Sequence, residues 1–80
     1  MKIMMRDGRE FAGTPVAIVK AMQGIAFGVE HLSLSQYVDG VAANTKKFEN
    51  VTLDVAGADD AAKAEALVQA MINNGLAGEP

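Results

Sequence analysis

Apolar and polar residues alternate at the start of the chain and predict a β-hairpin over residues 3–12. A three-residue turn at residues 6–8, with Gly8 in the left-handed bulge position, separates the two kinds of side chain onto opposite faces. Ile3, Met5 and Phe11 then share the apolar face, and Met4 lies opposite Glu10 on the other. A two-residue turn at residues 7–8 would place Glu10 among the apolar side chains, so we favour the bulged turn.

Apolar residues follow the hairpin at helical spacing and predict a first helix after Gly13. Thr14 can cap this helix with its hydroxyl group, and Pro15 suits the first turn because its missing N–H would have no partner there. The helix ends either at Gln23, before a glycine, or at Phe27, before the next glycine.

A second and a third helix are predicted by capping signals and apolar stripes. Ser33 and Gln36 form a capping box ahead of a stripe that runs from Leu34 to Phe48. Asp59 or Asp60 caps the third helix, which ends at residues 74–75 with Leu76 packing back on it. The inner face of the third helix is expected to hold Ala64, Leu67, Val68, Met71 and Ile72.

Between these helices, residues 51–55 alternate apolar and polar side chains and predict a half-buried strand. Joined to the hairpin, it would complete a small antiparallel or mixed three-stranded sheet packed against three helices. The expected fold class is therefore α+β, with the order β-β-α-α-β-α. No linker divides the chain, so residues 1–80 are expected to form a single domain.

The first helix is unusual because Lys20 and Gln23 are its only polar side chains after Pro15. A helix that is apolar on nearly every side needs cover on nearly every side, which favours a homodimer. The predicted interface consists of Val16, Val19, Met22, Ala26 and Phe27. Two alternatives stay open: residues 24–29 form a loop folded over the core, or the apolar face is a groove for a partner helix or peptide.

Composition excludes several functions. The 80 residues contain no cysteine, which excludes disulfides, a thiolate nucleophile and cysteine-based zinc sites. His31 is the one histidine, and with Glu30, Ser33 and Asp39 it forms no spacing that demands acid–base catalysis. We expect no enzyme activity, no metal site and no cofactor.

Charge favours protein over nucleic acid as the partner. The formal net charge is −3, whereas a phosphate-backbone binder gains its affinity from an excess of Lys and Arg. Lys2, Arg6 and Arg9 nevertheless gather in the hairpin, and a two-stranded ribbon can enter a DNA major groove. A nucleic-acid-binding regulator that uses these three residues is the alternative hypothesis.

The run RDGREFAGTPVAIV resembles the opening of short uncharacterised bacterial proteins in which an RDG hairpin leads into a helix begun by GTP. The resemblance covers the first half of the chain and implies no activity, so no residue takes a role from it. No apolar stretch looks like a secretory signal or is long enough to cross a bilayer, and a cytoplasmic location is expected. The sequence thus predicts a soluble, non-catalytic interaction or regulatory module that self-associates.

Overall fold

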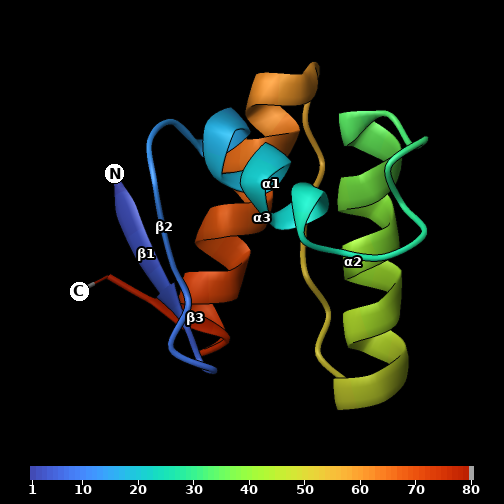
Figure 1. Cartoon of the computed structure of the whole chain (residues 1–80). Coiled ribbons are helices and arrows are strands. Elements are labelled where there is room, and N and C mark those ends of the chain that lie inside the picture. The colour runs from blue at the N-terminus through green and yellow to red at the C-terminus, as the bar shows by residue number, and fades with distance from the viewer. Residues whose placement is uncertain (80) are drawn as a thin grey trace.

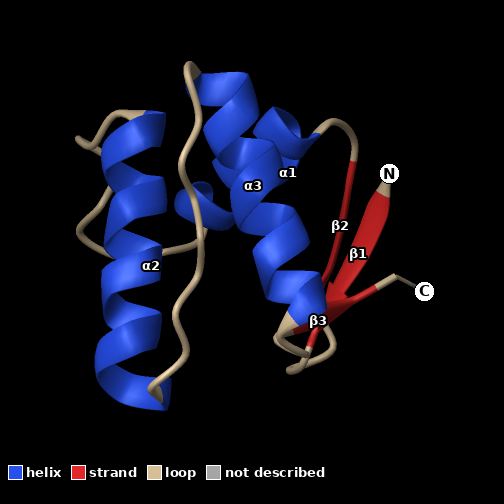
Figure 2. Cartoon of the chain, turned by 180° about the vertical axis from the view of Figure 1, so that it is seen from behind, coloured by secondary structure: helices blue, strands red, loops and turns tan. Residues whose placement is uncertain are grey.

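The computed structural model describes residues 1–79 and confirms the α+β class, with three helices and a three-stranded sheet (Figure 1). The sheet lies on one side, α1 and α3 occupy the middle, and α2 lies on the far side (Figures 1 and 2). The elements are β1 (Lys2–Met5), β2 (Glu10–Ala12), α1 (Pro15–Gly24), α2 (Leu34–Glu49), α3 (Asp60–Asn73) and β3 (Ala77–Gly78).

The hairpin has the predicted register. Ile3 lies opposite Phe11 and Met4 opposite Glu10. The Gly8 N–H donates to the Met5 carbonyl at 3.0 Å, and Gly8 has a φ of 93°, the left-handed conformation that a bulged turn requires. Ile3 is fully buried, so the face chosen by side-chain segregation is the one that meets the core.

The third strand is not the one predicted. β3 consists of Ala77 and Gly78, which pair antiparallel with β1, so that β1 is central in the order β2-β1-β3. The chain reaches this edge because α3 ends in a glycine-terminated turn. The Gly75 N–H donates to Ile72 and the Leu76 N–H to Met71, which reverses the chain direction and buries Leu76 as expected. The observed element order is β-β-α-α-α-β.

Residues 51–55, predicted as a strand, form an extended segment without strand pairing. The segment runs between α2 and α3, away from the sheet (Figures 1 and 2). Its alternation still reflects burial, because Leu53 is 5% exposed while Thr52 and Asp54 face solvent. Its neighbours are helices, whose backbone groups are already paired internally, so no ladder can form beside it.

Helix α1 begins as predicted and takes the shorter of its two expected lengths. The Thr14 hydroxyl accepts a hydrogen bond from the Ala17 N–H at 3.1 Å, and the helix ends at Gly24. Its solvent-facing stripe consists of Ala17, Lys20, Ala21 and Gly24. These small or charged residues face water at little cost, so the premise that α1 is too apolar for a single chain is wrong.

The remaining helix starts follow the predicted capping. Ser33 and Gln36 form both hydrogen bonds of the capping box on α2, and the Asp59 carboxylate accepts from the Ala62 N–H at 2.8 Å on α3. Ala64, Leu67, Val68 and Met71 of α3 are buried as expected, and Ile72 is half-buried.

Helices α2 and α3 are also joined by a polar contact. Lys63 donates to the Ser35 hydroxyl at 2.7 Å and to the Asp39 carboxylate at 2.8 Å, with only 15% of its side chain exposed. The lysine is largely desolvated but the Asp39 side chain is 60% exposed, so the contact joins the two helices as a partly buried ion pair. Among residues 1–79, no helix combines the length and apolar character needed to cross a membrane.

Two glycines provide a matched test of this packing. A Cβ at Gly57 would lie 2.7 Å from the Lys63 backbone nitrogen, whereas a Cβ at Gly40, inside α2, would meet nothing within 4 Å. We expect Gly57→Ala to destabilise the fold by about 1–3 kcal/mol through overpacking. Gly40→Ala should stabilise it by about 0.5–1 kcal/mol through helix propensity. Urea unfolding measures both, and equal effects of the same sign would contradict the close approach of residue 57 to α3.

Candidate interaction site

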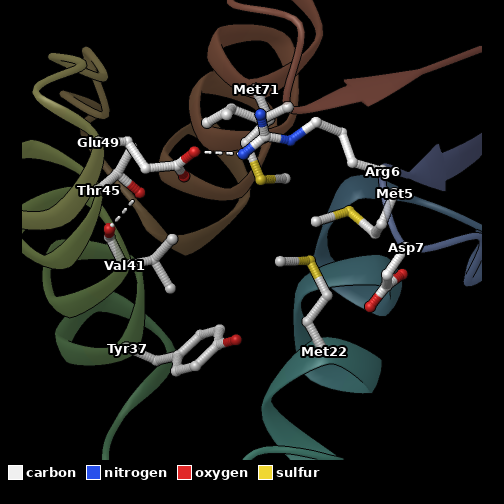
Figure 3. Close-up of a pocket in the computed structure, with 10 residues that line it drawn as sticks. Met5, Arg6, Asp7, Met22, Tyr37, Val41, Thr45, Glu49 and Met71 are labelled. Carbon is white, nitrogen blue, oxygen red and sulfur yellow. Dashed lines mark hydrogen bonds and ion pairs between the residues drawn. The ribbon is translucent and has the colours of Figure 1, made fainter.

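A cleft lies between the hairpin, α1 and α2, and Figure 3 shows its inner part. It consists of an inner hollow of about 300 Å³ and an adjoining outer hollow of about 190 Å³. Both are lined by Met5, Asp7, Met22 and Tyr37. We call the two hollows together the methionine cleft.

Three of the five methionines line the cleft from three different elements. Met5 comes from β1, Met22 from α1 and Met71 from α3. In Figure 3 the thioether ends of Met5 and Met22 point into the space that faces α2. Methionine side chains are flexible and polarisable, so a surface built from them adapts to apolar ligands of varied shape. Nothing in the spacing of the five methionines along the sequence predicts that these three would meet.

Tyr37 forms the opposite wall of the cleft. Its side chain projects from α2 across the gap toward the side held by Met22 and Asp7 (Figure 3). The residue is 8% exposed, and burial raises the pKa of the phenol above its ordinary value of 10.0 because the phenolate would lose hydration. The tyrosine therefore presents a neutral hydroxyl group to the cleft at physiological pH.

An ion pair spans the inner hollow. Arg6, in the hairpin turn, donates to the Glu49 carboxylate at the end of α2 (Figure 3). Both side chains are substantially exposed, 60% and 40%, so the pair adds little to stability. Its effect is geometric, because it connects the two walls of the cleft at the inner hollow.

The loop that follows α1 borders the outer hollow. Ile25 and Ala26 line this hollow, Ile25 is 52% exposed, and Phe27 is 98% exposed. The loop is anchored by Gln23, whose side-chain amide donates to the Val29 carbonyl at 2.8 Å and to the Leu32 carbonyl at 3.0 Å. The exposed Phe27 therefore belongs to a loop whose backbone is held by two hydrogen bonds from Gln23.

The structure places the five predicted interface residues in different environments. Val19 is fully buried within the single chain, so it is not available to a partner, which corrects its assignment to a dimer interface. Met22 is 8% exposed, and its side chain lines the methionine cleft instead of an outer face of the helix. Val16 and Ala26 are half-buried, and Phe27 alone is fully exposed. The predicted alternative of a loop over residues 24–29 describes this region, with Phe27 outside the core.

The basic hairpin residues each lie near a carboxylate. Lys2 is 3.9 Å from Glu10 and Arg9 is 3.2 Å from Asp7. Arg6 pairs with Glu49, as described above. These pairs reduce the positive potential that a phosphate backbone would meet, so the geometry does not favour the nucleic-acid hypothesis.

Ser33 and Asp39, which were considered with His31 for acid–base catalysis, make structural contacts instead. Ser33 caps α2 through Gln36, and Asp39 pairs with Lys63. His31 and Glu30 are exposed in the loop before α2. Within residues 1–79, no group of three or more His, Asp or Glu side chains is placed to hold a metal ion.

No family model, curated protein or solved structure matches the chain. Function must therefore be inferred from the geometry of the methionine cleft and the exposed loop.

Tyr37 allows a direct test of the cleft, because it is the one tyrosine in a chain without tryptophan. Its pKa is raised in the folded state, so the unfolded chain loses the phenolic proton first as pH increases. The contribution of Tyr37 to the free energy of unfolding should be constant below pH 10 and fall as pH rises through the folded-state pKa. Urea unfolding at several pH values, with Tyr37→Phe as the control, measures this; an equal fall in both proteins would exclude Tyr37 as its source.

The paired hairpin charges lead to a second prediction. We expect the chain to leave the mobility of duplex DNA unchanged at low salt, where phosphate contacts are strongest. A mobility-shift titration at low and moderate salt measures this. A band shift that weakens steeply with salt and is lost in Arg9→Gln would instead support the nucleic-acid hypothesis.

Proposed function

We propose that the chain is a small, non-catalytic interaction module of the cytoplasm that self-associates. The observation that carries this proposal is the exposure of Phe27, whose side chain is 98% accessible to solvent beside the half-exposed Ile25. A surface phenyl ring next to another exposed apolar side chain and a cleft is typical of an interaction site.

The fold holds Phe27 outward instead of folding it into the core. Ala26 precedes it and Val29 follows two residues later, and both are half-buried against the core. Gly28 has a φ of 77°, which turns the backbone sharply after Phe27. Since its neighbours are fixed on both sides, little backbone freedom remains for residue 27 to lose when a partner covers its side chain.

The loop after α1 lets two copies meet without direct contact between like charges. Each copy carries a formal net charge of −3, so two copies repel one another at long range. Residues 25–29, Ile-Ala-Phe-Gly-Val, contain no charged side chain, so contact through this loop places no like charges against one another. Isologous dimers are the commonest closed assemblies, and burial of apolar surface would stabilise a domain as small as this one.

A comparison of two exposed phenylalanines tests this proposal. Phe48, on the outer surface of α2, is 75% exposed and lies beside the Lys47 ammonium group. We expect Phe27→Ser to weaken dimerisation at least a hundredfold, because two buried phenyl rings per dimer contribute about 3 kcal/mol or more. Phe48→Ser, with the same change in composition, should leave the dimer unchanged.

Sedimentation equilibrium over a range of concentrations measures the association of all three proteins. Circular dichroism confirms that each variant remains folded. A monomeric wild-type chain at every concentration would overturn the proposal. An equal loss of association in both variants would indicate nonspecific apolar contact instead of an interface at Phe27.

A further inference from the structure

We infer that the outer hollow of the methionine cleft receives Phe27 of a second copy, so that two copies exchange phenyl rings about a twofold axis. This inference rests on the proposed self-association and names the surface that covers Phe27. It assigns a receptor role to Met5, Met22 and Tyr37, which form the walls of the hollow.

The hollow has the size and chemistry of a phenyl-binding site. Its volume is about 190 Å³, which exceeds the ~150 Å³ of an enclosed apolar cavity that binds benzene, and unlike that cavity it is open to solvent on one side. Met5 and Met22 contribute thioether sulfurs that contact aromatic ring edges favourably. Phe11 and Tyr37 contribute aromatic rings, which prefer edge-to-face or offset contact with another ring.

A chain's own Phe27 does not fill this space. Ile25 and Ala26 line the outer hollow, yet the next side chain along the loop is 98% exposed. The half-buried Ala26 on one side and the turn at Gly28 on the other direct Phe27 away from the molecule. The ring and the hollow are therefore both unoccupied surfaces of the same copy.

Phe27 and the hollow lie close together on one copy, and this closeness favours a twofold symmetric dimer. An isologous dimer requires that the inserted group and its receptor belong to one patch, which then meets the same patch on the other copy. Here the inserted residue directly follows two residues that line the receptor. A twofold axis beside this loop therefore produces two identical insertions and a closed dimer, whereas a remote receptor would produce open chains of molecules.

The charges around the hollow are compatible with this contact. Asp7 and Arg9 also line the hollow and form an ion pair at 3.2 Å, so these two residues add no excess of one sign. Both side chains are more than half exposed and can exchange partners across the twofold axis. Two copies thus meet through apolar surfaces bordered by opposite charges in equal number.

Methionine methyl groups give a direct test by nuclear magnetic resonance. One copy is labelled with [¹³C-methyl]methionine in a deuterated background and mixed with an unlabelled protonated copy. We expect intermolecular NOEs from Phe27 ring protons to the Met5 and Met22 methyl groups. Met4 is the internal control, because adjacent residues of a strand point to opposite faces of the sheet. NOEs from Phe27 to Met4, or none to Met5 and Met22 in a sample shown to be dimeric, would overturn the inference.

A mixing experiment separates this inference from self-association itself. Met5→Trp fills the hollow and keeps Phe27, whereas Phe27→Ser removes the ring and leaves the hollow open. We expect each variant alone to dimerise at least a hundredfold more weakly than the wild type. An equimolar mixture should form heterodimers of intermediate affinity, because the ring of one variant can enter the hollow of the other.

The outcomes distinguish the two proposals. If Met5→Trp dimerises like the wild type, the hollow is not the receptor, although self-association through Phe27 stands. A mixture that gains no affinity over the separate variants also overturns the reciprocal exchange. A monomeric wild-type chain overturns both proposals. Should Met5→Trp not fold, the NOE measurement decides the inference by itself.

Discussion

Helix α3 is packed from both sides, and the arrangement of the other elements depends on this double burial. One side meets α1 and the sheet, and the other meets α2 and the extended segment 51–55 (Figures 1 and 2). Ala64, Leu67 and Val68 of α3 are fully buried in the core. The backbone of Gly57 passes so close to the start of α3 that a methyl group would not fit. These contacts fix how far α2 stands from the sheet.

The methionine cleft is a consequence of that separation. With α3 and α1 between them, the backbones of the hairpin and α2 stay apart along their lengths, and the Arg6–Glu49 ion pair connects them at one end. Flexible methionine side chains fill part of the remaining space and leave the outer hollow open beside Ile25. The proposed binding surface therefore arises where helix packing and sheet packing meet without complete closure, and the exposed loop after α1 stands at its edge.

The third strand and the apolar first helix show the limits of local patterns. Residues 51–55 alternate because one side faces the core between two helices, and any extended segment on a core produces that alternation whether or not a strand lies beside it. The true strand at residues 77–78 is too short to show any period. In α1, alanines counted as apolar occupy the solvent-facing stripe, so the composition of the helix overstated its need for cover.

Local sequence patterns were sufficient to predict the features that rest on contacts between near neighbours in the chain. The bulged turn at Gly8, the caps at Thr14 and Ser33, and the glycine-terminated end of α3 each depend on a few adjacent dihedral angles and hydrogen bonds. Long-range packing instead set which strand joins β1, which residues of α1 are covered, and that Met5, Met22 and Met71 line one cleft. Those outcomes depend on how the helices pack around α3. This packing involves residues far apart in the sequence, so no single stretch of residues encodes it.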